Sequence, residues 1–219
     1  LLLFACNSNS GSFVIGNKLF SKTFIFDENK AGSILVNYQK NESQKNIANT
    51  KSTPFFEFVI DNQLITSNDK CWIFKNNSER EMGNGGTEHI LKFEGTTNPV
   101  KGLQVIICNQ TFPESSLMRE KLVLQTENES FTLNKHKGKS HFKFPSYAIQ
   151  NENNNLVEST EIRIASYEKK PITFGDKQKG NHMYYPDIIT TKVSDVVASA
   201  KGPISIVSNG DVSWFTAYE

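Results

Sequence analysis

Short runs of alternating hydrophobic and polar residues recur along this sequence, and clusters of Gly, Asn, Pro, Ser and Lys separate them. Such a two-residue alternation places the apolar side chains on one face of a strand. No run keeps a 3.6-residue period over the length of an ordinary helix. The pattern predicts an all-β protein whose strands form a large antiparallel β-sandwich, with at most one or two short helices.

The clearest runs predict individual strands. Residues 12–15 and 18–26 are expected to form a hairpin around Gly16 and Asn17. Residues 102–112 are apolar on both faces, which predicts a central strand covered on both sides. Further strands are expected at residues 33–39, 54–65, 116–126, 141–144, 158–165, 204–207 and 212–218.

Two segments are expected to differ from this pattern. Residues 40–53 are polar and rich in Asn and Lys, which predicts a long loop. Residues 194–200 are expected to form a short helix, because Ser194 is a good N-cap and Gly202 and Pro203 end the segment.

The start of the chain carries the most specific local signal. Residues 1–5 are apolar and end in the small Ala5, Cys6 follows, and residues 7–12 are polar. This order is typical of a secretory leader that ends in a bacterial lipobox, whose cysteine receives a lipid. We therefore expect residues 1–12 to be a leader remnant, lipobox and tether, and residues 13–219 to form the β domain. The alternative is a chance apolar start with a buried or free thiol.

A lipid on Cys6 would anchor an exported bacterial protein to a membrane, in the periplasm or at the cell surface. The 24 basic and 23 acidic residues give a net charge of +1, so nothing favours nucleic acid as a partner. Cys71 and Cys108 either pair in an oxidising compartment or remain buried thiols. No spacing of Cys, His or acidic residues predicts a metal site, and no motif predicts a cofactor.

The sequence contains no catalytic motif that we can identify. It lacks Gly-x-Ser-x-Gly and His-Glu-x-x-His, and no two acids stand out as the carboxylate pair of a glycosidase. Aromatic residues beside polar ones are the better candidates, because rings stack on sugars and polar groups bind their hydroxyls. The candidates for carbohydrate binding are Asp69, Trp72, Glu88, His89, His182, Tyr185 and Trp214.

These candidates also have a purely structural interpretation. Residues 69–72 and 182–187 are expected to lie in loops, but large aromatic residues are mostly buried. On that interpretation Trp72 and Trp214 fill the core, and the tyrosines near residue 185 close one end of the sandwich. Glu88 and His89 would then be a solvated pair in a flexible turn after the Gly-rich residues 83–86.

Several segments resemble the N-terminal domain of family 36-like glycoside hydrolases, the alpha-galactosidase (melibiase) type. The match begins with FEFVIDNQLITSND, which resembles the strand, turn and ligand-side loop near the start of such domains. It extends diffusely over about residues 20–219 and includes residues 101–107, 116–124, 180–187 and 213–219. The resemblance implies a β-supersandwich, similar to the galactose mutarotase fold.

In that family the catalytic aspartates lie on a following (β/α)₈ barrel, and this sequence shows no alternation of strands and helices. The resemblance therefore implies a non-catalytic, carbohydrate-associated domain of an exported glycosidase, whose partners are the barrel domain and an oligo- or polysaccharide. The membrane is the further partner that a lipid on Cys6 would add. Two alternatives remain open. One is a stand-alone surface lipoprotein that binds glycan or a partner protein. The other is a mutarotase-like or lyase-like enzyme, for which Glu88, His89 and His182 must converge.

The lipobox interpretation predicts that Cys6 is the lipid acceptor. In bacterial cells that make the protein with its own leader, we expect a clickable fatty acid to label the wild type and Cys71→Ser. Cys6→Ser should remain unlabelled, because it lacks the acceptor thiol. In-gel fluorescence measures the label, and a labelled Cys6→Ser protein would contradict the interpretation.

Overall fold

A computed structural model of the chain describes residues 10–51, 53–127, 130–136, 139–140, 142–149, 157–166, 184–193, 204–208 and 213–217. The described residues form strands and turns without any helix, so they hold no helical segment capable of crossing a membrane. The predicted all-β class is confirmed. The helix predicted at residues 194–200 lies outside the described residues.

The chain forms two compact units, Leu1–Gln150 and Asn151–Glu219. In the second unit the described strands form one antiparallel sheet in the order β16-β15-β17-β18. These strands are β15 (Val157–Ser166), β16 (Tyr184–Val193), β17 (Ile204–Ser208) and β18 (Ser213–Ala217). That residues 13–219 form one β domain stays a prediction.

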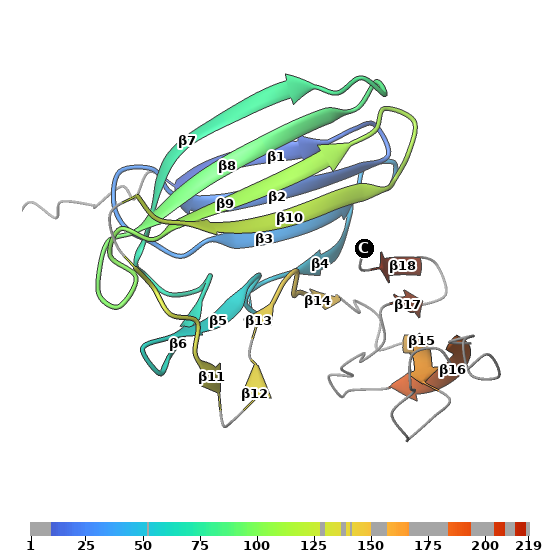
Figure 1. Cartoon of the computed structure of the whole chain (residues 1–219). Coiled ribbons are helices and arrows are strands. Elements are labelled where there is room, and N and C mark those ends of the chain that lie inside the picture. The colour runs from blue at the N-terminus through green and yellow to red at the C-terminus, as the bar shows by residue number, and fades with distance from the viewer. Residues whose placement is uncertain are drawn as a thin grey trace, which may run out of the picture. The chain divides into compact units, whose positions relative to one another are not determined.

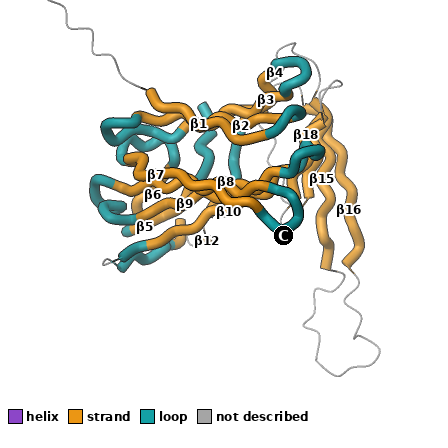
Figure 2. Tube along the Cα trace, turned by 90° about the horizontal axis from the view of Figure 1, so that it is seen from above, coloured by secondary structure: helices purple, strands orange, loops and turns teal. Residues whose placement is uncertain are grey.

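Two antiparallel sheets stack face to face in the first unit, as Figures 1 and 2 show. The first sheet has the order β1-β2-β3-β4-β14, with β1 (Ser10–Gly16), β2 (Phe20–Asp27), β3 (Leu35–Lys40), β4 (Lys45–Asn49) and β14 (Ala148–Ile149). The second sheet has the order β10-β9-β8-β7, with β7 (Trp72–Glu81), β8 (Thr87–Gly95), β9 (Gln104–Thr111) and β10 (Met118–Gln125). This stack is the predicted β-sandwich.

A third, smaller sheet and a short ladder complete the first unit. The third sheet has the order β13-β5-β6, with β5 (Glu57–Ile60), β6 (Gln63–Thr66) and β13 (Phe142–Lys143). The ladder pairs β11 (Lys135–His136) with β12 (Lys139–Ser140). Strands β13 and β14 are close in sequence but belong to different sheets, so the segment between them connects the third sheet to the first.

The predicted β1–β2 hairpin is confirmed, and Asn17 stabilises its turn. The backbone N–H of Asn17 donates to the carbonyl oxygen of Phe20 at 2.9 Å. Its side-chain Oδ1 accepts a hydrogen bond from the backbone N–H of Leu19 at 2.8 Å. An asparagine side chain that caps its own turn is the chemistry expected at this position.

Three predictions for the first unit are wrong. The run at residues 54–65 is not one strand, because it reverses at Asp61 and Asn62, whose φ angles of 50° and 59° allow a tight hairpin turn. The expected loop at residues 40–53 contains β4, which pairs with β3 and β14. Strand β9 is central but not covered on both sides: its inward side chains are buried, whereas Ile106 and Cys108 are only half-buried.

Aromatic rings fill much of the space between the two large sheets. Phe26 of β2 stacks on Phe74 of β7 with a centroid distance of 4.4 Å, and its ring meets Phe93 of β8 edge-on at 5.4 Å. Such aromatic pairs contribute about 0.5–1.5 kcal/mol beyond the area they bury. The fully buried apolar residues around them include Phe24, Ile34, Val36, Leu91, Val105 and Ile107.

A charged residue also lies in this core. The side chain of Lys22 is fully buried, and its Nζ donates a hydrogen bond to Oδ1 of Asn109 at 3.0 Å. Lys22 also forms an ion pair with Glu120 of β10, and its Nζ lies 4.2 Å from the ring centroid of Phe55 and 4.6 Å from that of Phe24. Burial lowers the pKa of Lys22, although the charge of Glu120 opposes this shift.

The segment that leads to β14 packs beside this charged cluster. The ring of Tyr147 lies 5.4 Å from that of Tyr38, and the ring of Phe144 lies 5.1 Å from that of Phe55. Burial, together with the negative charge of Glu120, raises the pKa of Tyr38 well above its ordinary value. The cluster therefore links both large sheets and the connecting segment.

Strand β7 is the outer strand of the second sheet on one side. Its last seven residues, from Lys75 to Glu81, are exposed. The pairing of β7 with β8 shifts by one residue between Phe74 and Asn76, which marks a β-bulge.

The buried ion pair predicts a strong asymmetry between single and double substitutions. Glu120→Gln should lower the free energy of unfolding by about 3 kcal/mol, because it leaves the Lys22 charge buried without its partner. Replacing both residues with apolar ones, Lys22→Met with Glu120→Leu, should bring stability back to within about 1 kcal/mol of the wild type. Urea denaturation followed by circular dichroism measures both effects.

The exposed pair of Lys18 and Glu114, 2.7 Å apart, provides the matched control. Glu114→Gln should change the free energy of unfolding by less than about 1 kcal/mol, because solvent screens exposed pairs. If Glu120→Gln were as mild as Glu114→Gln, the buried pair would have no special role in stability.

Candidate functional site

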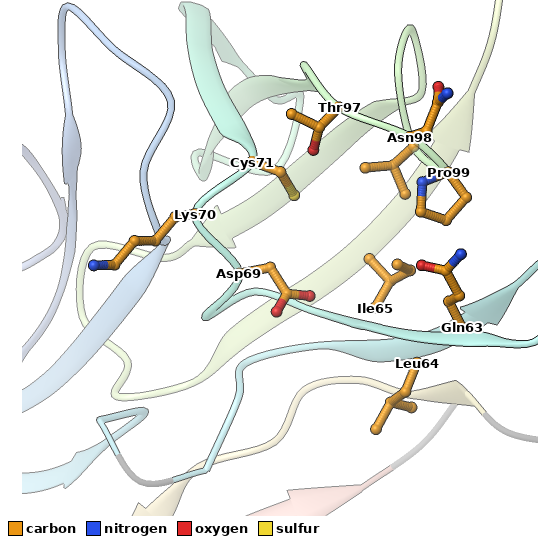
Figure 3. A pocket seen from close by; sticks show the side chains of 10 residues that line it. Gln63, Leu64, Ile65, Asp69, Lys70, Cys71, Thr97, Asn98 and Pro99 are labelled. Carbon is orange, nitrogen blue, oxygen red and sulfur yellow. The ribbon is translucent and has the colours of Figure 1, made fainter.

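A pocket of about 300 Å³ lies where three segments of the first unit meet (Figure 3). Strand β6 lines one side, the turn before β7 lines the second, and the loop between β8 and β9 lines the third. The lining residues are Gln63, Leu64, Ile65, Asp69, Lys70, Cys71, Thr97, Asn98, Pro99 and Val100. The volume is at the lower end of the range for small-molecule sites, roughly 300–1,000 Å³.

The turn before β7 holds Asp69 in place. Its Oδ2 accepts a hydrogen bond from the backbone N–H of Thr66 at 2.7 Å, and the backbone N–H of Asp69 donates to the carbonyl oxygen of Thr66 at 3.3 Å. A short acidic side chain that bonds nearby backbone is favoured in such turns. Within the described part of the chain, Oδ1 of Asp69 accepts no hydrogen bond, so this oxygen is available to a ligand.

The loop between β8 and β9 reaches the pocket by folding back on the end of β8. The backbone N–H of Gly95 donates to the carbonyl oxygen of Leu103 at 2.8 Å, and that of Gly102 donates to Gly95 at 2.9 Å. A Cβ atom at position 95 would lie 2.2 Å from the carbonyl oxygen of Val100, so only glycine permits this close approach. The loop thereby places Pro99 and Val100 opposite β6.

The pocket combines polar and apolar groups. The side chains of Asp69, Cys71, Ile65 and Gln63 point toward the space between the three segments, and the ring of Pro99 closes it (Figure 3). Lys70 and Leu64 point away from that space in the same view. A carboxylate and an amide beside aliphatic walls suit a small ligand with several hydroxyl groups and an apolar face.

Cys71 is a thiol of low reactivity within this pocket. Burial and the neighbouring charge of Asp69 raise the pKa of Cys71 to about 11. Both Cys71 and Cys108 are free thiols, so they do not pair with each other. A thiol with such a pKa is almost entirely protonated near neutral pH and is a poor nucleophile.

Trp72, predicted to lie in a loop, is instead the first residue of β7 and part of the core. Its ring is 1 % exposed and packs edge-on against Phe56 and Phe58, with centroids 5.4 and 6.5 Å away. Its Nε1 donates a hydrogen bond to the carbonyl oxygen of Thr66 at 2.8 Å. The indole therefore supports the turn that carries Asp69 but offers no exposed face to a sugar.

Glu88 and His89 do not form a cluster, because they lie on a strand and not in a turn. Consecutive residues of β8 point to opposite faces of the sheet. Glu88 is on the outer face, where it accepts a hydrogen bond from Gln110 at 3.0 Å and pairs with Arg80 at 2.6 Å. These contacts lower its pKa, and the hydrogen bond from Gln110 is the larger cause.

His89 points to the inner face of the second sheet. Its Nδ1 lies 3.1 Å from Oε1 of Glu79, and its ring meets Phe13 of β1 edge-on at 6.4 Å. Gly95, where the pocket loop begins, lies seven positions after Glu88 along β8, a span of roughly 23 Å at the usual rise per strand residue. Asp69 therefore shares no site with Glu88 or His89.

The remaining predicted site residues fall outside the first unit or outside the described residues. Tyr185 is in β16, opposite Ala165, so the loop predicted at residues 182–187 is wrong from residue 184 onward. Trp214 is in β18, opposite Val207. His182 and Cys6 lie outside the described residues. Their roles stay predictions.

Of the residues that line this pocket, the sequence singled out Asp69 but not Gln63, Ile65 or Pro99. The signal for Gln63 and Ile65 was the Asp61–Asn62 pair, a good hairpin turn that would have placed β6 beside β5. No local signal indicates that Pro99 faces them, because the β8–β9 loop is brought there by long-range pairing.

The residues described in the structure contain no group of three or more His, Cys, Asp and Glu side chains placed to hold a metal ion. Comparison with known protein families, with characterised proteins and with solved structures finds no match to this chain. The resemblance to family 36-like glycoside hydrolases therefore stays a prediction.

The raised pKa of Cys71 predicts an unusual pH profile for its alkylation. The rate with iodoacetamide should rise about tenfold per pH unit from pH 8 toward pH 11 without levelling, because only the thiolate reacts. Peptide mass spectrometry separates Cys71 from Cys108.

Asp69→Asn should increase the rate at pH 9, because it removes the charge that helps to raise the pKa of Cys71. Asp61→Asn, in the exposed β5–β6 turn, is the matched control and should leave the rate unchanged. A rate that levels off near pH 8.5 in the wild type would show that the thiol is not perturbed.

Proposed function

We propose that this chain is a non-catalytic, carbohydrate-associated β domain of an exported bacterial glycoside hydrolase of the alpha-galactosidase type. On this proposal Cys6 carries a lipid anchor, and a separate (β/α)₈ domain supplies the catalytic carboxylates. The proposal is supported by the resemblance described above and by the β-sandwich architecture. Fold alone is a weak guide to function, whereas the residues that line the pocket have a specific chemistry.

The observation that carries the proposal is the composition of the pocket around Asp69. A sugar ring presents hydroxyl groups at its edge and C–H groups on its faces. Asp69 and Gln63 provide a carboxylate and an amide for adjacent hydroxyls, and Ile65, Pro99 and Val100 provide an aliphatic wall for the C–H groups. The volume of about 300 Å³ suits one or two sugar rings.

The geometry also favours weak binding over tight binding. The wall is aliphatic and lacks an aromatic ring, because Trp72 is turned into the core. Stacking on an aromatic face, which strengthens many sugar contacts, is therefore missing among the lining residues. A pocket of this kind suits a domain that positions a chain end for a catalytic neighbour.

Substitutions in the pocket test the proposal. Asp69→Asn and Gln63→Ala should each weaken binding of α-linked galacto-oligosaccharides about tenfold, because each removes a hydrogen bond to a hydroxyl group worth about 1.4 kcal/mol. Isothermal titration calorimetry with the complete chain measures the affinity, and circular dichroism confirms that the variants fold.

Asp61→Asn is the matched control, since Asp61 is acidic, exposed and outside the pocket. It should bind as tightly as the wild type. No heat of binding for any galactoside with the wild type, or equal binding by Asp69→Asn and Asp61→Asn, would remove the pocket from the proposal.

A further inference from the structure

The outer face of the second sheet carries an excess of positive charge. Alternation and strand register place one set of side chains on this face, away from the first sheet. Its charged members are Lys75, Arg80, Glu88, Lys92, Glu94, Arg119, Lys121 and Glu127, whose carboxylate accepts a hydrogen bond from the outward side chain of Gln104. Five are basic and three are acidic, which gives this one face a formal charge of +2, whereas the whole chain carries +1.

Two of the three acidic residues of this face are already neutralised by neighbours on β7. Glu88 pairs with Arg80 at 2.6 Å, and Glu94 pairs with Lys75 at 3.4 Å. Within the described part of the chain, Lys92 and Lys121 make no ion pair. Among the described residues of this face, the basic ones without an ion partner are therefore Lys92 on β8 and Lys121 on β10.

Half-buried apolar residues lie between these cations. Ile90, Ile106 and Val123 point outward from β8, β9 and β10, next to Lys92 and Lys121 in the register. Neighbouring strands lie about 4.8 Å apart and each residue adds about 3.3 Å along a strand, so the cations are distributed over a surface and do not converge on a point. Such an arrangement fits an extended, repeatedly charged polymer better than a single small anion.

We propose that this basic face binds an acidic polysaccharide whose repeating units carry carboxylate or sulfate groups. Charge complementarity selects a polyanion, and the distributed cations favour one whose charges also recur along an extended chain. The choice of a glycan over other polyanions rests on the proposed function of the domain. The face is separate from the pocket around Asp69, which lies beyond the end of β8, so the two bind independently.

Matched polymers test whether the face recognises charge. Polygalacturonate and its fully methyl-esterified form share one backbone and differ in charge, and heparin replaces carboxylates with sulfates. The wild-type chain should bind polygalacturonate or heparin, with an affinity that falls as salt is raised, and should bind the methyl ester at least tenfold more weakly. Biolayer interferometry with immobilised polymer measures the affinities.

The double variant Lys92→Gln with Lys121→Gln should weaken polygalacturonate or heparin binding about tenfold at low salt. Lys30→Gln with Lys51→Gln removes the same charge from exposed positions outside this face, so it should bind nearly as the wild type does. Equal loss in the two double variants would overturn the proposal, because net charge alone would then explain binding.

Two further probes decide the class of partner. Tighter binding to poly-glutamate, or to vesicles with anionic lipid, than to either acidic polysaccharide would overturn the assignment to a glycan. Asp69→Asn should keep full binding to the acidic polymer, and the Lys92 and Lys121 double variant should keep full galactoside binding. A pocket that does not bind galactosides can therefore be distinguished from a basic face that does not bind acidic polymers.

Discussion

The ion pair between Lys22 and Glu120 is the interaction that fixes how the two large sheets of the first unit face each other. Lys22 enters the core from β2 and meets Asn109 of β9 and Glu120 of β10. A buried charge tolerates few arrangements, because any shift that separates it from its partners leaves it unsatisfied. Apolar contacts alone, such as those of Phe26, would allow the two sheets to pack in more than one relative position.

The faces of the second sheet follow from this constraint. A slip of one residue in β9 or β10 would exchange inward and outward side chains. Asn109 and Glu120 point inward to Lys22, so Gln110 and Lys121 must point outward. The separation of Glu88 from His89 follows the same rule one strand further on, because β8 is in register with β9. One buried contact thus determines both the core and the basic face.

Local alternation predicted the elements whose two faces differ in polarity. The β1–β2 hairpin and the strand expected at residues 116–126 were correct for this reason. Strand β7 was missed because its residues from Lys75 to Glu81 are polar on both faces, and β4 was missed because its residues are polar and lack a clear alternation. In the pocket, Asp69 was recognisable as a polar residue in a turn. Its neighbours across the pocket depend on the fold of the β8–β9 loop, which no local pattern encodes.

The exposed outer side of β7 affects how separate molecules meet. An edge strand with free backbone groups invites another strand to add to the sheet. Here an added strand would have to lie beside the charged side chains of Lys75, Glu79, Arg80 and Glu81, and the bulge before Asn76 bends the edge away from a straight ladder. These features act as a barrier to open-ended growth through the β7 edge.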